Sequence, residues 1–239
     1  MTTPLERPMT VVAGACRVPW GAAADGLPGA APPQLPSVPG FVTSRFSPLV
    51  AAAVEACLGG PPGDPDLVAG RGERTAIVLA TMCGDTTTTD TATRRMVAGQ
   101  VHSPLLFFQS VTTSVLGHLS RRYGITGPIS CVSDCADLSS QALGLAEVVL
   151  DDDWLDQVLV VGVEVAAEDR VDWVRGHVDR PCPLGPLPRG DAVVALLIRR
   201  GGETGEPALP RSAAPAPSAY GWLAPLVALC PEGGPRPAL

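Results

Sequence analysis

A cysteine lies at the turn between a short apolar run and a segment with helical periodicity. The run Ile129–Val132 follows Gly127-Pro128 and predicts a short buried strand, and the sequence after Ser133-Asp134 predicts a helix that begins there. Backbone N–H groups and the positive end of the helix dipole meet at such a helix start, where they stabilise a thiolate. Cys135 is therefore a candidate nucleophile.

The helix after Ser133-Asp134 is predicted from the spacing of its small and apolar residues. The helix prediction depends on a stripe of small and apolar residues at i, i+3, i+4 and i+7 spacing, formed by Ser139, Ala142, Leu143, Ala146, Val149 and Leu150.

If Cys135 reacts, Asp134 or His118 could serve as a general base, with backbone amides as an oxyanion hole. The structural interpretation of each is favoured: Cys135 fills the turn, Asp134 caps the helix and His118 is a hydrogen-bonded core histidine.

Four blocks of sequence follow one another downstream of residue 103. They are residues 104–111 (PLLFFQSV), 117–124 (GHLSRRYG), 127–128 (GP) and 158–164 (VLVVGVE). In this order they resemble the N-terminal half of the β-ketoacyl-acyl-carrier-protein synthases, and a weaker similarity continues at residues 180–181 and 189–194. The resemblance implies an α/β fold, the thiolase-like N-terminal half, with a central mixed sheet and helices on both faces.

The resemblance places the family's nucleophile at Ala136 and not at Cys135. In the family a catalytic Cys is the eighth residue after the Pro of the Gly-Pro pair, and Ala136 is the eighth residue after Pro128. The family's helix Ala, six residues further along, is matched by Ala142. A shift of one residue at the start of a helix turns a side chain by about 100°. Cys135 is thus out of register with the family's catalytic residue.

A condensing synthase also needs two His residues, which the family carries in its C-terminal half. That half lies beyond the end of this sequence, and His102, His118 and His177 match neither residue. We therefore expect a truncated ketosynthase-like protein of fatty-acid or polyketide-type biosynthesis, either an accessory or a chain-length-factor-like subunit that does not condense on its own. The family also has an acidic residue at the position of Glu164, for which we expect hydrogen bonds to a loop backbone.

Two alternatives remain open at this point, and with them the question whether the chain is an enzyme. One is a small acyltransferase or thioesterase that uses Cys135. The other is a non-catalytic scaffold that docks an acyl-carrier protein. The resemblance implies an acyl-carrier protein or acyl thioester as a partner, and a homodimer or a heterodimer with a full-length ketosynthase. In the family the strand before the central helix lies near the twofold axis, and Ile129–Val132 is its counterpart here.

Composition narrows the class of protein. The 239 residues include no Lys, and the net charge of −7 argues against nucleic-acid binding because no basic patch can replace phosphate counterions. Arg94-Arg95 and Arg121-Arg122 are candidate contacts for an acidic carrier protein, although paired Arg on a helix is more often a solvated face. With 46% hydrophobic and 4% aromatic residues, a core of Ala, Val and Leu is expected.

The seven cysteines lack metal-ligand spacing, so no metal and no cofactor are predicted. We expect reduced thiols in a cytoplasmic protein, without a signal peptide and without a membrane-spanning segment.

The chain is expected to form one medium-sized domain. Residues 1–8 are predicted to be a disordered tail, residues 9–200 a ketosynthase-like N-terminal domain, and residues 201–239 a Pro-, Ala- and Gly-rich tail in which 222–229 could dock. Strands are predicted at 10–18, 75–81, 129–132, 154–165 and 191–200. Helices are predicted at 47–58, at 92–97, from 107 through 119, and after 134. Half a thiolase fold should expose a sheet face and helices, which predicts an oligomer.

Overall fold

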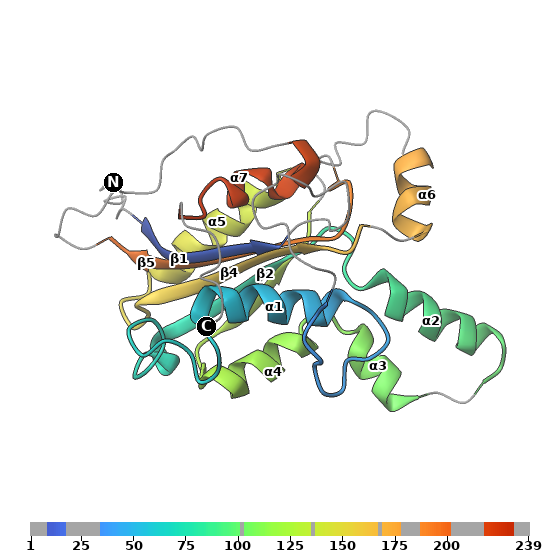
Figure 1. Cartoon of the computed structure of the whole chain (residues 1–239), viewed down its shortest axis with the longest axis horizontal. Helices are drawn as coiled ribbons and strands as arrows, with labels where there is room; N and C mark the ends of the chain where they lie inside the picture. Colours follow the sequence, from blue (N-terminus) through green and yellow to red (C-terminus); the bar gives the residue numbers. More distant parts are fainter. Residues whose placement is uncertain are drawn as a thin grey trace, which may run out of the picture.

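A computed structural model of the chain describes residues 9–17, 34–100, 103–134, 137–166, 169–177, 187–201 and 218–231. The sequence predictions for residues 1–8, Cys135, Ala136 and His102 fall outside these ranges. Within them, one mixed five-stranded sheet carries helices on both faces, as the α/β prediction required (Figure 1).

The sheet has the strand order β1-β5-β4-β2-β3. Its strands are β1 (Met9–Arg17), β2 (Thr75–Ala80), β3 (Ile129–Val132), β4 (Gln157–Glu164) and β5 (Ala192–Arg200). Strands β3, β2 and β4 are parallel, whereas β5 runs antiparallel to both β4 and β1. Every residue of β2 and β4 is buried, which explains why these strands read as continuous apolar runs without alternation.

One face of the sheet is covered by helices α1 (Phe46–Leu58) and α4 (Ser114–Tyr123), which lie below it in Figure 1. Helix α1 buries its Leu, Val and Ala residues against alternate residues of the strands, among them Ile77, Leu159 and Leu197. These aliphatic side chains form the larger of two hydrophobic cores, as the composition predicted.

The opposite face is covered by α5 (Leu138–Leu150), by the 3-10 segment η3 (Ser218–Leu223) and by α7 (Ala224–Val227), all above the sheet in Figure 1. Tyr220, Leu223 and Leu226 of this C-terminal segment are fully buried. The segment approaches the sheet so closely that a Cβ on Gly162 would lie 2.6 Å from Leu223 Cδ2. The expected bare sheet face is therefore absent from the described part of the chain, because residues 218–231 fill it.

Two helices project beyond the end of the sheet in Figure 1: α2 (Thr86–Val97) and α3 (Pro104–Ser110). The helix predicted from 107 through 119 is in fact two helices, since Val111 adopts an extended conformation (φ −78°, ψ 110°). The β-branched run Val-Thr-Thr at 111–113 loses side-chain freedom in a helix, which favours a break there. Shorter elements are η2 (Gly72–Arg74) and α6 (Asp169–His177).

Strand β3 has the predicted bounds, but the prediction that it is buried is wrong. It is the last strand of the sheet, and Ile129 and Cys131 are exposed. Its one neighbour is β2, so the other edge of β3 carries backbone groups without a strand partner in the described structure. No helix in the described ranges is both long and apolar enough to cross a bilayer.

Gly127 is required at the turn into β3. A Cβ at this position would overlap the backbone carbonyl of Thr75, which cannot move without disturbing β2. We expect Gly127→Ala to lower the free energy of unfolding by about 1–3 kcal/mol or more, measured by urea denaturation. Gly117→Ala in α4 is the matched control, because nothing lies within 4 Å of its added Cβ. It should change stability by less than about 1 kcal/mol, in the stabilising direction. Equal destabilisation by both variants would contradict this account.

Candidate functional site

The carboxyl ends of the parallel strands β2, β3 and β4 meet at one edge of the sheet. Ligands of open α/β sheets bind at such edges. Three connections lie there: the β2–α2 loop at 81–85, the β3–α5 turn at 133–137, and the end of β4 at Glu164. We define the candidate site as these three connections together with Trp222.

Glu164 is the centre of the candidate site. Its side chain is fully buried, and Oε1 accepts hydrogen bonds from the backbone N–H of Met82, from Trp222 Nε1 at 3.1 Å and from Thr81 Oγ1 at 3.4 Å. The N–H of Cys83 donates to Oε2 at 3.2 Å. The carboxylate therefore holds the loop after β2 in place. It also occupies the backbone N–H groups of Met82 and Cys83, which are then not free to bind an anionic ligand.

Burial raises the pKa of Glu164 to about 7, and the hydrogen bonds from Met82, Cys83, Trp222 and Thr81 oppose this rise. A carboxyl with such a pKa resembles a general acid or base. It is nevertheless inaccessible, and its oxygens are already occupied by four donor groups. Its role in this structure is to position the β2–α2 loop.

Trp222 and Ser139 complete the candidate site, and the sequence analysis assigned neither a role there. The hydroxyl of Ser139, on α5, donates to the backbone carbonyl of Trp222. A buried tryptophan N–H needs a hydrogen-bond acceptor, and this requirement was the signal in the sequence that could have indicated a role for Trp222. The sequence could not name Glu164 as that acceptor, because the two residues are 58 positions apart.

The turn after β3 differs from the prediction. Helix α5 begins at Leu138, and its N-cap is Asp137, whose carboxylate accepts from the N–H of Ser140 at 3.2 Å. The predicted cap, Asp134, instead accepts a hydrogen bond from Gln141 Nε2. Ser133 Oγ donates to the carbonyl of Met82 at 3.4 Å, so this turn contacts the loop that Glu164 holds. Cys135 and Ala136 lie between these described residues.

His118 lies away from the candidate site. It is on α4, whose apolar residues belong to the core on the α1 side of the sheet, and its ring packs edge-on against Phe41 with centroids 6.4 Å apart. Its Nε2 is buried without a hydrogen-bond partner among the described residues. Burial lowers the pKa of His118, and Arg122 and Arg121 lower it further. The structure does not bring His118 to Asp134 or Glu164.

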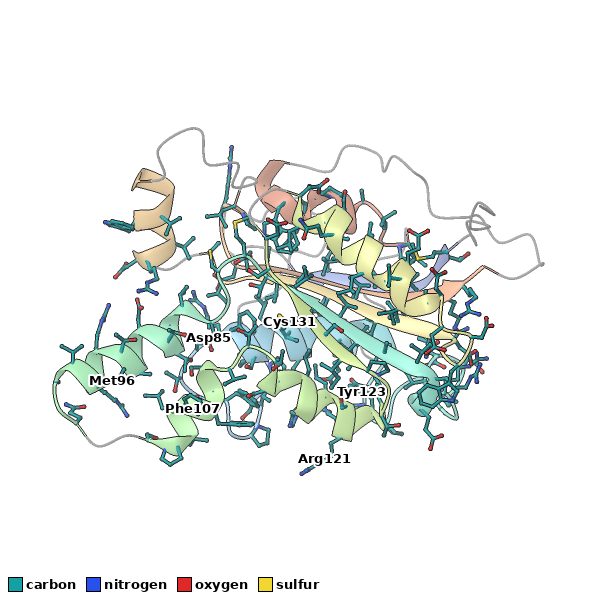
Figure 2. The ribbon with its side chains drawn as sticks, turned by 180° about the vertical axis from the view of Figure 1, so that it is seen from behind. Asp85, Met96, Phe107, Arg121, Tyr123 and Cys131 are labelled. Carbon is teal, nitrogen blue, oxygen red and sulfur yellow. The ribbon has the colours of Figure 1, made fainter. Side chains whose placement is uncertain are left out.

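An apolar surface lies next to the candidate site. Helices α2 and α3 pack on each other, and Figure 2 shows Met96 and Phe107 on these neighbouring helices. A shallow groove between the two helices is lined by Met96, Leu106 and Phe107. We define the α2–α3 surface by its exposed apolar residues, which are Met96, Val97, Leu105, Phe107, Phe108 and Val111.

The paired arginines of the sequence analysis lie at the ends of two helices. Arg94 and Arg95 lie in the last turn of α2, and Arg121 and Arg122 lie in the last turn of α4, where positive charge complements the helix dipole. In the described ranges, no cluster of three His, Cys, Asp or Glu side chains could hold a metal ion.

Neither a protein-family model nor a curated protein matches the sequence. Solved structures do match its fold. A chain in the complex of the ketosynthase ApeO with its chain length factor ApeC from Xenorhabdus doucetiae has a TM-score of 0.58 at 19% identity. The protein has the ketosynthase fold. The match covers 82% of this chain and 80% of that chain, so the two chains are similar in length.

Two further structures share this fold. The ishigamide ketosynthase/chain length factor has a TM-score of 0.61 at 18% identity, over 84% of this chain and 64% of that one. A complex named AntDE:AntF, in which a type II polyketide synthase acyl-carrier protein meets its ketosynthase bound to the hexaketide, gives 0.56 at 13% identity. That match covers 82% of this chain and 58% of the other. This chain thus spans less than two thirds of either.

The buried carboxyl predicts a specific pH dependence of stability. Unfolded Glu164 ionises near its ordinary value of 4.5, whereas the folded carboxyl keeps its proton up to about pH 7. The folded state binds more protons between these values, so the free energy of unfolding should fall as pH rises through this interval. We expect wild type to lose about 2–3 kcal/mol more than Glu164→Gln between pH 4.5 and 8, measured by urea denaturation.

Trp222→Phe tests the same network from the donor side. Removing the indole N–H withdraws one hydrogen bond from the carboxylate, so the pKa of Glu164 should rise further and the loss of stability should move to higher pH. Trp154→Phe is the control, because Trp154 is 52% exposed and should leave the pH profile unchanged. Parallel profiles for wild type, Glu164→Gln and Trp222→Phe would refute the assignment.

Proposed function

We propose that the protein is a chain-length-factor-like subunit that pairs with a full-length ketosynthase and shapes the acyl pocket without condensing on its own. The observation that carries the proposal is the exposed apolar α2–α3 surface, together with the exposed residues of β3. Phe107 is 71% exposed, Met96 54% and Ile129 42%. Clustered aromatic and aliphatic side chains at this exposure mark a site of protein association.

The edge of β3 supports the same proposal. Backbone N–H and C=O groups along an edge strand can pair with a strand of another chain. A partner strand beside Ile129–Val132 would extend the sheet and cover Ile129 and Cys131 at the same time. The full-length partner would supply the catalytic cysteine and histidines that the family needs.

The chemistry of the described residues favours a non-condensing role. By resemblance, Ala136 takes the position of the family's nucleophile. Glu164 is sealed by its hydrogen bonds, and His118 lies on the other face of the sheet. Neither is placed to act as acid or base for a substrate at the β3–α5 turn.

The comparisons add support from chain length. A chain in a ketosynthase–chain length factor complex has about the length of this one, so a complex of that kind can include a chain of this size. The second similarity is also to a ketosynthase/chain length factor.

Affinity purification from the native host tests the pairing. We expect the tagged chain to recover a ketosynthase with an intact active-site cysteine in about equal molar amount, identified by mass spectrometry. Phe107→Asp should reduce this recovery at least about tenfold, because it places a charge in the centre of the apolar surface. Val148→Asp, on the exposed side of α5, is the control and should retain the partner. A monomer in light scattering with no recovered ketosynthase would contradict the proposal.

An acyl-transfer assay separates the proposal from its alternatives. The chain is incubated with an acyl-carrier protein loaded with a medium-length acyl chain, and its intact mass is measured. We expect no covalent adduct, and Cys135→Ala should leave product formation by the ketosynthase complex unchanged. An adduct mapped to Cys135 would instead identify an acyltransferase. Stable binding of the carrier protein in the absence of any ketosynthase would identify a docking scaffold.

A further inference from the structure

The two ends of the described chain meet at the edge strand β1. A Cβ built on Gly14 would lie 3.0 Å from Pro231 Cδ and 3.4 Å from Cys230 Cα. Residue 14 belongs to β1, and residues 230–231 follow α7 directly. The end of the C-terminal segment therefore lies directly on the first strand.

This approach brings two thiols together. Cys16 lies two residues after Gly14 on β1 and belongs to the core on the α5 side of the sheet, against which Cys230 also packs, Cys16 being buried and Cys230 half-buried. The contact with Cys230 lowers the pKa of Cys16, and the same contact raises that of Cys230. The two thiols are therefore placed to be joined by a two-electron oxidant.

We propose that Cys16 and Cys230 form a reversible disulfide that fastens the C-terminal segment to β1. With a hydroperoxide as the oxidant, one of the two thiolates attacks a peroxide oxygen, which yields a sulfenic acid and one water or alcohol. The other thiol then attacks the sulfenic sulfur, and the hydroxyl leaves as water after taking up the thiol proton. Two thiols and one peroxide are consumed, and cleavage by a dithiol reductant restores both cysteines.

The disulfide would fasten the end of the segment that has the fewest polar contacts. The beginning is held by a hydrogen bond from the N–H of Arg189 to the carbonyl of Ala219, and by the contacts of Trp222 with Ser139 and Glu164. The far end rests on β1 through Cys230 and Pro231. Because the segment carries Trp222 to Glu164, its attachment also stabilises the loop after β2. This inference is independent of the proposed subunit role.

Oxidation of the purified full chain with hydrogen peroxide tests the proposal. We expect the intact mass to fall by about 2 Da, the loss of two hydrogens. Under denaturing conditions two of the seven thiols should be lost, and digestion should yield a peptide pair linking Cys16 to Cys230. The melting temperature should rise by about 5 °C or more and return to its initial value with dithiothreitol.

Single substitutions make the result specific. Cys230→Ser and Cys16→Ser should each abolish the linked peptides and the rise in melting temperature. Cys131→Ser, on the exposed edge strand, is the control and should behave as wild type. Peroxide that adds only oxygen atoms, with the Cys16 and Cys230 peptides recovered unlinked, would overturn the proposal. An oxidised chain with the linkage but the melting temperature of the reduced chain would refute its stabilising effect.

Discussion

The buried carboxyl of Glu164 is the interaction on which this end of the molecule depends. It ends β4, receives the backbone N–H groups of Met82 and Cys83 after β2, and binds the indole of Trp222 from the C-terminal segment. A carboxyl that is buried away from water must accept hydrogen bonds from donors within the protein, since an unpaired buried charge is very costly. One residue therefore connects three segments that are far apart in the sequence.

The C-terminal segment changes which apolar surfaces of the described chain are exposed. The C-terminal segment buries Tyr220, Leu223 and Leu226 over the face that a second half-fold would otherwise occupy. Exposed apolar residues lie on the α2–α3 surface and at β3, whereas the sequence analysis expected them on the sheet face. A bare sheet face would have required a covering domain, whereas the described sheet has both faces covered.

Local patterns predicted most of the framework. All five strands were predicted close to their observed positions, because apolar runs of strand length flanked by turn residues specify strands. Helix boundaries were less certain, since two aspartates, Asp134 and Asp137, could both cap α5. The choice was decided by Gln141, which binds Asp134 and leaves Asp137 for the N–H of Ser140. The residue type of a helix cap can thus be predicted from the local sequence, whereas tertiary contacts determine which candidate residue caps the helix.

The sequence by itself determined the α/β class, the order of the strands along the chain and the resemblance to ketosynthases, because these follow from apolar periodicity and from short motifs. Only the tertiary structure decided that β3 is an edge strand, that His118 lies on the far face from α5, and that Trp222 reaches Glu164. The physical reason is that burial and hydrogen-bond partners depend on contacts between distant segments. A buried donor needs an acceptor, but which acceptor it finds is determined by packing.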